Sequence, residues 1–193
     1  FDTSVGHDYI NDADARYEFY HRQEERLPFD LDYMNRITKG GLPRKSLNVI
    51  LASTGVGKSM FMCHHAASVL TQGKNVLYIT LEMAEERIAE RIDANLMNVP
   101  LDQLENLSYD QYSSKINRIA KRNTGKLIIK EYPTGAAHAG HFRALLEELK
   151  LKRDFTPHII FLDYLNISSS ARMRGLGGSV NTYSLIKSIA EEI

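Results

Sequence analysis

A glycine-rich octapeptide between a predicted strand and a predicted helix constrains the fold of this chain more than any other feature of the sequence. Residues 52–59 read Ala-Ser-Thr-Gly-Val-Gly-Lys-Ser, after the apolar run Leu47–Leu51 and before a helical pattern from Lys58 to about Leu70. Glycines let backbone N–H groups curl around an anion, and the following helix adds its positive N-terminal end. The segment predicts a phosphate-binding loop of the α/β type. An ordinary glycine-rich turn between strand and helix is the alternative.

Individual positions of this loop have separate expected roles. Lys58 is expected to reach the β and γ phosphates of a nucleotide, and the hydroxyl of Ser59 to bind Mg²⁺. Ala52 departs from the usual pattern, which begins with glycine, and its methyl group is tolerated only where φ is negative. The residues expected to bind nucleotide are Ser53, Thr54, Gly55, Val56, Gly57, Lys58, Ser59 and Met60.

Two acidic residues follow apolar runs further along the chain. Asp163 comes directly after His158–Leu162, the usual setting of the carboxylate that holds Mg²⁺ in ATPases with such a loop. Glu82 follows the run Asn75–Ile79, where a carboxylate near the γ phosphate would orient and deprotonate the attacking water. Alternatively, Asp163 caps a turn, and Glu82 lies in the first turn of the next helix, where its negative charge interacts favourably with the helix dipole.

Strands and helices alternate along the chain, which predicts a parallel sheet with helices on both faces. The predicted strands are Leu47–Leu51, Asn75–Ile79, Leu127–Ile129 and His158–Leu162. The predicted helices are Lys58–Leu70, Ala84–Asn95, Tyr109–Arg122 and Phe142–Leu151.

The two ends of the chain differ from this pattern. An amphipathic helix is predicted from Asp8 to about Gln23, and Leu27-Pro28 ends the segment. We therefore expect a linker helix and arm at 1–28 and the main domain at 29–193. Because the chain begins without methionine and stops inside a helical pattern at 181–193, we expect it to be part of a longer protein.

Composition excludes several classes of protein. The 24 basic and 24 acidic residues balance, so any contact with nucleic acid must be local. The single cysteine, Cys63, excludes an internal disulfide framework, suits a reducing cytoplasm and is interpreted as a core residue. No apolar run reaches the roughly 18 residues that a membrane-spanning helix needs, so we expect a cytoplasmic protein without a membrane partner.

Several motifs in this order resemble the DnaB-type replicative helicases, which are RecA-like ATPases. They are Ser53–Ser59, Leu81-Glu82-Met83 and Asp163-Tyr164-Leu165, together with Leu31-Asp32 and Thr38-Lys39-Gly40-Gly41 before the loop. Ile92–Asn95 and Lys130–Gly135 resemble the replicative helicases of T-even-type bacteriophages in particular, which also carry alanine at the position of Ala52. The resemblance spans nearly the whole chain.

The resemblance implies a hexameric ring with ATP between subunits, which moves 5′ to 3′ along single-stranded DNA and meets a primase and a loader. In a phage-encoded protein this would take place in the host cytoplasm. It also assigns roles: Lys58 and Ser59 match the phosphate-loop pair, Glu82 the catalytic glutamate, and Asp163 the aspartate that holds Mg²⁺ partly through water. The N-terminal helix resembles the linker that docks on a neighbouring subunit.

Three arginines have roles implied by the same resemblance. Arg91 matches an arginine close to the nucleotide, although it could instead extend along the apolar stripe of its own helix. Arg172 and Arg174, in the small and basic loop 168–179, match a channel loop that contacts DNA, and would bind phosphates without reading bases. The alternative for this loop is a surface segment without a DNA contact.

Elements that the family carries later in its sequence are not found in these 193 residues. They are a sensor, a second DNA loop and an arginine that reaches the neighbour's ATP. In the family's topology a further strand separates the strands that carry Lys58 and Asp163, so we expect an incomplete sheet and weak or absent ATPase activity from these residues alone.

Other functions share part of this pattern. A RecA-like recombinase would have the same loop, glutamate and aspartate, and a nucleotide-gated assembly ATPase would use them to organise a ring or filament. A small-molecule kinase would need an acceptor pocket and a lid, which the sequence does not indicate. Unwinding of DNA distinguishes the helicase from the first two.

Overall fold

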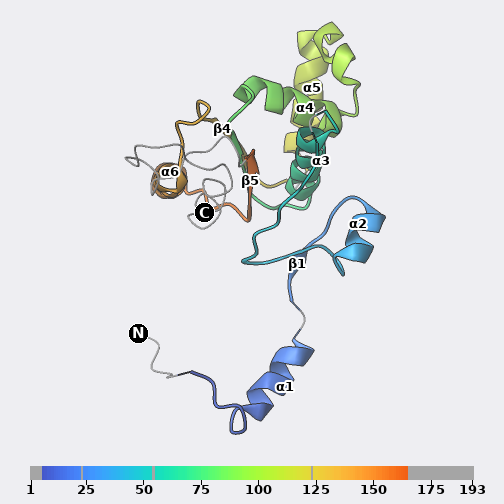
Figure 1. Ribbon diagram of the computed structural model, residues 1–193. Helices are drawn as coiled ribbons and strands as arrows, with labels where there is room; N and C mark the ends of the chain where they lie inside the picture. The colour runs from blue at the N-terminus through green and yellow to red at the C-terminus, as the bar shows by residue number, and fades with distance from the viewer. Residues whose placement is uncertain (1–5, 23, 54, 123, 165–193) are drawn as a thin grey trace. The chain divides into compact units, whose positions relative to one another are not determined.

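The computed structural model describes residues 6–22, 24–53, 55–122 and 124–164 (Figure 1). The chain forms two compact units, residues 1–48 and residues 49–193, called here the N-terminal and C-terminal units. The domain boundary expected between residues 28 and 29 remains a prediction. The helical pattern at 181–193 and the loop 168–179 lie outside the described residues.

In its described residues, the N-terminal unit consists of two short helices and a small antiparallel ladder. Its elements are α1 (Ala13–His21), β1 (Arg26–Leu27), α2 (Asp32–Ile37) and β2 (Leu42–Pro43). Leu27 pairs with Leu42, and Gly41 must be glycine because a Cβ there would collide with the backbone of Leu27. The sequence did not predict α2 or this ladder, which are too short for periodicity to detect.

The helix α1 is shorter than predicted. The carboxylate of Asp8 accepts hydrogen bonds from the N–H groups of Ile10 and Asn11, at 3.0 and 2.9 Å, so the chain turns before the helix begins. No residue of α1 is buried, and Tyr17 and Tyr20 are 65% and 71% exposed. The apolar side chains of this helix are therefore not buried against the other described elements of the N-terminal unit.

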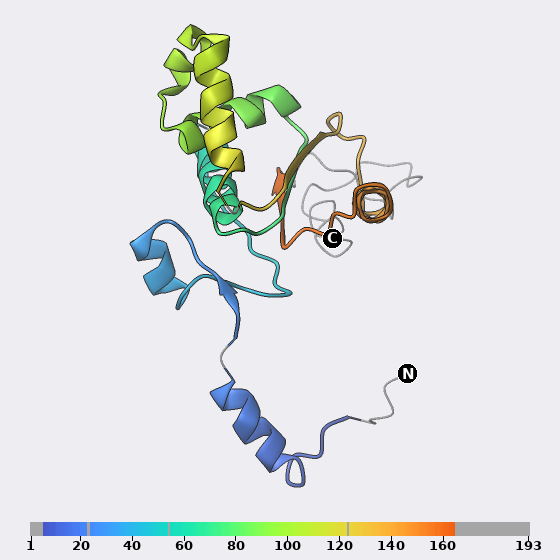
Figure 2. The same ribbon diagram turned by 180° about the vertical axis from the view of Figure 1, so that it is seen from behind.

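The C-terminal unit is an α/β fold, as predicted. Its elements are α3 (Lys58–Thr71), β3 (Val76–Thr80), α4 (Glu85–Met97), the 3₁₀ helix η1 (Leu101–Asn106), α5 (Tyr109–Ala120), β4 (Leu127–Glu131), α6 (Ala139–Arg153) and β5 (Ile159–Asp163). Among the described residues, three parallel strands form a sheet in the order β4-β3-β5. Figures 1 and 2 show α3, α4 and α5 on one side of this sheet and α6 on the other.

The central strand β3 is buried on both faces, and its alternating side chains enter two different cores. Leu77 and Ile79 belong to the cluster with Phe142, Leu145 and Leu149 of α6. Tyr78 points to the opposite face, where it contacts Cys63 of α3. Cys63 is 1% exposed, so its prediction as a core residue is confirmed.

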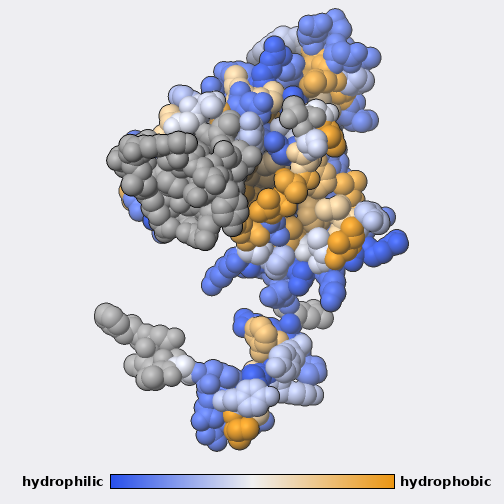
Figure 3. All heavy atoms as spheres, viewed as in Figure 1, coloured by the Kyte–Doolittle hydropathy of each residue, from blue (hydrophilic) through white to orange (hydrophobic). Residues whose placement is uncertain are grey.

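The predicted strand Leu47–Leu51 is wrong: this segment forms neither a helix nor a strand. Val49 is 71% exposed and Leu51 95% exposed. A strand satisfies its N–H and C=O groups by pairing with a neighbour. Among the described residues no strand pairs with this segment, and β5 pairs only with β3. In Figure 3, hydrophobic residues gather in a patch on the face of the C-terminal unit that is turned toward the viewer.

Candidate functional site

Two glycines of the glycine-rich loop adopt a left-handed backbone conformation. Gly55 and Gly57 have φ values of 77° and 101°, in the left-handed region that favours glycine. Gly57 caps α3, which begins at Lys58. Ala52 is not among the non-glycine residues with positive φ, so alanine is accommodated at this position without strain. The loop thus delivers Lys58 and Ser59 in the first turn of a helix, where the helix dipole favours anions.

The carboxyl end of the sheet lies next to this helix start. The ammonium Nζ of Lys58 lies 3.9 Å from the centre of the Tyr164 ring, immediately after the last residue of β5. Asp163 is in register with Thr80, and its carbonyl accepts a hydrogen bond of 2.8 Å from the N–H of Leu81. Lys58, Asp163 and the residue before Glu82 are therefore brought to one edge of the sheet.

Two threonines fix the segment that carries Glu82. The hydroxyl of Thr80 donates to the carbonyl of Met83 at 2.8 Å and accepts from its N–H at 3.0 Å. The hydroxyl of Thr134 donates to the carbonyl of Leu81 at 2.8 Å. The backbone is thus held on both sides of Glu82, whose own side chain is exposed to solvent. An exposed carboxylate on a fixed backbone is suited to orient a water molecule.

Asp163 is buried, with 1% of its surface exposed. Its Oδ2 accepts a hydrogen bond of 3.0 Å from the hydroxyl of Tyr78, whereas its buried Oδ1 has no hydrogen-bond partner among the described residues. A buried carboxylate oxygen without a partner is unfavourable unless a cation or a water satisfies it. The residues present therefore fit Mg²⁺, which prefers oxygen ligands and retains several waters.

Burial controls the protonation of the groups around Asp163. It raises the pKa of Tyr78 well above the usual range, and the neighbouring Cys63 and Asp163 raise it further. Burial also raises the pKa of the Cys63 thiol, although the hydrogen bond with Tyr78 and the charge of Arg91 partly offset this. Both groups stay protonated near neutral pH, so the thiol donates to the phenol at 3.9 Å and the phenol to the carboxylate.

Some of the remaining predicted site residues lie near this edge of the sheet, and the others lie outside the described residues. Arg91 is half-buried on α4, and its charge acts on Cys63, which places it on the same side of the sheet as Tyr78. Ser53, Val56 and Met60 are exposed around the loop. Thr54, Arg172 and Arg174 lie outside the described residues.

Sequence reasoning missed Tyr78, Tyr164, Thr80 and Thr134. A signal existed for Tyr78, because a phenol inside the apolar run Val76–Thr80 needs a buried hydrogen-bond partner. Tyr164 had a weaker signal, since it adjoins Asp163 in the sequence. The roles of Thr80 and Thr134 depend on the turn around Glu82 and carry no sequence signal of their own.

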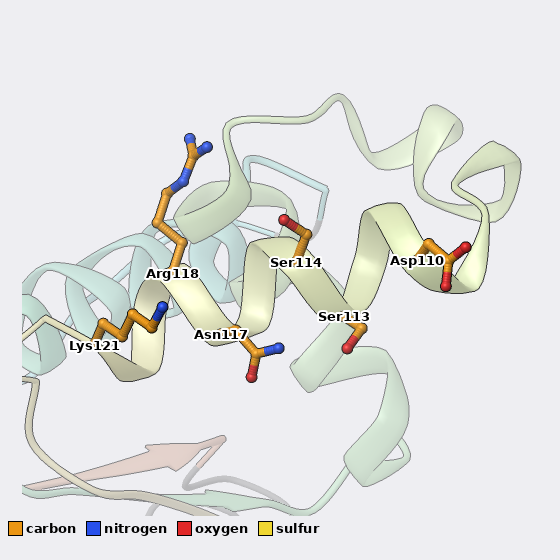
Figure 4. A pocket seen from close by; sticks show the side chains of 6 residues that line it. All are labelled: Asp110, Ser113, Ser114, Asn117, Arg118 and Lys121. Carbon is orange, nitrogen blue, oxygen red and sulfur yellow. The ribbon is translucent and has the colours of Figure 1, made fainter.

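A separate hollow of about 520 Å³ lies along α5 (Figure 4). Polar and charged side chains of this one helix line it: Asp110, Ser113, Ser114, Asn117, Arg118 and Lys121. None of the predicted site residues contributes to it, so we place the candidate site at the carboxyl edge of the sheet.

In the described part of the chain, no helix has the length and apolar character needed to cross a membrane.

Comparison with known families decides between the possible members of this fold class. The family described as the DnaB-like helicase C terminal domain matches residues 27–193. The chain belongs to this family. The match covers the loop, both candidate acids and the three described strands of the parallel sheet, so the expected RecA-like character of the DnaB-type fold is confirmed.

Relatives within and around the DnaB-like family share different parts of the chain. The DnaB-like replicative helicase of Enterobacteria phage T4 is 48% identical over 196 residues, covering 100% of this chain and 41% of its own length. A probable plasmid replicative DNA helicase of Chlamydia psittaci is 30% identical over 167 residues, covering 79% of this chain and 35% of its own length. The chain thus spans well under half of the length of these relatives.

A solved DnaB-like replicative helicase, described together with its interactions with primase, has the same fold. It superimposes with a TM-score of 0.70 at 17% identity, over 97% of this chain and 44% of its own. The resemblance to the phage helicases predicted from the motifs is therefore confirmed at the level of the family.

Proposed function

We propose that this chain is the ATPase motor of a replicative DNA helicase that couples hydrolysis of magnesium-ATP to movement along single-stranded DNA. The observation that carries the proposal is the meeting of Lys58, Asp163 and the fixed Glu82 segment at one edge of the sheet. This arrangement supports phosphoryl transfer, which depends mainly on positioning and on neutralising phosphate charge.

The residues divide the chemical work. The N–H groups of the loop and the first turn of α3 bind the phosphates, and Lys58 neutralises charge that develops on the γ phosphate. Glu82 orients a water molecule and accepts its proton. Ser59 and Asp163 would hold Mg²⁺, partly through water, and the ion would supply Lewis-acid stabilisation of the phosphate oxygens.

Assembly and partners complete the proposal for the full-length protein. Family membership supports a hexameric ring with ATP at the subunit interfaces, 5′ to 3′ movement, and contacts with a primase and a loader. The exposed aromatic side chains of α1 suit docking on a neighbouring subunit. Arg172 and Arg174 are proposed to bind DNA phosphates without base selection. The protein acts in the host cytoplasm if it is phage-encoded.

Unwinding of forked DNA by the full-length protein tests this function. We expect ATP-dependent 5′ to 3′ unwinding that Lys58→Ala reduces by about a hundredfold or more, because it removes a charge that acts on the transition state. Lys74→Ala, a lysine outside the predicted site, is the matched control and should retain unwinding. ATP hydrolysis without unwinding would contradict the helicase assignment and favour a recombinase or an assembly ATPase.

A further inference from the structure

The hydroxyl group of Tyr78 has a position that packing does not explain. Tyr78 lies in the middle of the central strand, with 0% of its surface exposed. Its ring stacks on Phe161 of β5, with centroids 5.7 Å apart and planes tilted by 20°. A phenylalanine would make the same ring contacts without bringing a polar group into the core. The hydroxyl is thus the part of this side chain that needs a reason.

The strand register directs this hydroxyl to Asp163. Tyr78 is paired with Phe161, and Asp163 follows two residues later on the same face of β5. A tyrosine is long enough to reach such a diagonal neighbour. Its hydroxyl donates to Oδ2 of Asp163 at 3.0 Å, and this leaves Oδ1, also buried, without a partner among the described residues. One carboxylate oxygen is therefore held, and the other is left to bind something else.

A second contact orients the hydroxyl. The thiol of Cys63 lies 3.9 Å from the phenol oxygen and donates to it, so the phenol proton remains directed at Asp163. Cys63 lies five residues after Lys58 on α3. The two hydrogen bonds from Cys63 to Tyr78 and from Tyr78 to Asp163 thus link α3, the helix that follows the glycine-rich loop, to β5, the strand that carries Asp163.

We propose that Tyr78 is a positioning residue for the magnesium site: its hydroxyl fixes Oδ2 of the Asp163 carboxylate and leaves Oδ1 as the oxygen that would hold Mg²⁺, directly or through water. The inference rests on the proposed function, because that function requires Mg²⁺ with the nucleotide. Groups that hold a metal-binding carboxylate in place tune its affinity for the ion without touching the ion themselves.

Tyr78→Phe in the full-length protein tests the inference, because it removes one oxygen atom and keeps the ring. We expect the Mg²⁺ concentration for half-maximal ATP hydrolysis to rise about tenfold. Binding of Mn²⁺ to the protein with a non-hydrolysable ATP analogue, followed by electron paramagnetic resonance, should weaken to the same extent. Binding of a fluorescent ATP analogue in EDTA should stay close to the wild-type value, because the phosphate loop is unchanged.

Tyr112→Phe provides the matched control. The hydroxyl of Tyr112 donates to Asp93 at 3.2 Å, so this variant also removes a tyrosine–aspartate hydrogen bond, but on α5 and α4 away from Asp163. We expect it to leave the dependence on Mg²⁺ and Mn²⁺ unchanged. Thermal melting of both variants shows whether either change acts through overall stability.

The outcomes separate the inference from the proposed function. A Tyr78→Phe variant with wild-type affinity for both ions would overturn the role of Tyr78 and leave the proposed function standing. Equal weakening in Tyr78→Phe and Tyr112→Phe would also overturn it, since the effect would then follow stability. A wild-type protein whose nucleotide binding takes up no Mn²⁺ would overturn both.

Discussion

Two apolar runs of five residues, 47–51 and 76–80, have opposite structures although their compositions are alike. Each contains four hydrophobic residues and one polar residue. The second run is the strand β3, with every side chain buried and a parallel partner on each side. The first forms no strand, and Leu51 is 95% exposed. Pairing with neighbouring strands, and not apolar composition, therefore decides which run becomes a strand.

The difference extends to the candidate site, because each run leads into part of it. Glu82 follows β3 and Asp163 is the last residue of β5; these two strands are paired in the sheet, and hydrogen bonds fix the segment that carries Glu82. Lys58 follows the run 47–51, and its backbone is set by the glycine turns and the start of α3. The acidic side of the site is thus more firmly supported by the sheet than the basic side.

The largest expected effect concerns the acidic side. Glu82→Gln in the full-length protein should slow ATP hydrolysis by about 10²–10⁴-fold, because the amide cannot accept a proton from water. Nucleotide binding should persist, since the phosphate loop is intact. Glu86→Gln, an exposed residue in the first turn of α4, is the control and should hydrolyse ATP normally. Equal rates in both variants would remove Glu82 from the chemistry.

The next prediction compares the two runs directly. Ile79→Ala should lower the free energy of unfolding by about 2–5 kcal/mol, because Ile79 is 1% exposed and leaves a cavity in the core. Leu51→Ala should change it by less than about 0.5 kcal/mol in the 193-residue chain, as for other exposed positions. Urea unfolding of both variants provides the measurement. Similar losses would show that the run 47–51 is packed like β3.

Much of the fold could be predicted from sequence, and the exceptions share a cause. Periodicity gave α3, α4, β3 and β5 nearly to the residue, because these elements bury a regular set of side chains. It failed for the run 47–51, which has no strand partner among the described residues, and for the short ladder in which Leu27 pairs with Leu42. In the candidate site, motif spacing indicated Lys58 and Asp163, but the contact from Tyr78 depends on strand register.

A smaller effect, on the pH dependence of stability, is expected from the buried His65 of α3. His65 is 2% exposed, and its ring packs edge-on against Phe161. Burial lowers the pKa of His65 from 6.5 to about 4, and the charge of His64 contributes a smaller part of this shift. Between these values the unfolded chain binds the proton and the folded chain does not, so stability falls as pH decreases from 6.5 to 4. The loss reaches about 3 kcal/mol at most.

Urea unfolding of the wild-type protein and of His65→Leu at several pH values checks this dependence. The difference in unfolding free energy between the two proteins should shift in favour of His65→Leu below pH 6.5. Asp93, whose pKa burial raises, is present in both proteins and cancels in this comparison. A difference that stays constant from pH 7 to pH 4 would exclude His65 as the source.

The smallest effect concerns the basic side. Lys58 lies over the ring of Tyr164, a contact worth about 0.5–1 kcal/mol, and it must leave the ring to reach phosphate. Tyr164→Leu should therefore tighten nucleotide binding in EDTA by about twofold to fivefold. Tyr132→Leu removes another lysine–tyrosine contact, in which Lys130 lies 5.7 Å from the ring centre, and should leave binding unchanged. Weaker binding in Tyr164→Leu would mean that the ring supports Lys58 instead of competing for it.

A crystal structure of the full-length protein with Mg²⁺ and a non-hydrolysable ATP analogue tests the central claim most directly. We expect the phosphates at the N-terminus of α3 beside Lys58, with the ion near the hydroxyl of Ser59 and Oδ1 of Asp163. Nucleotide bound elsewhere, such as in the hollow along α5, or phosphates that lie away from Lys58 and Asp163, would contradict it.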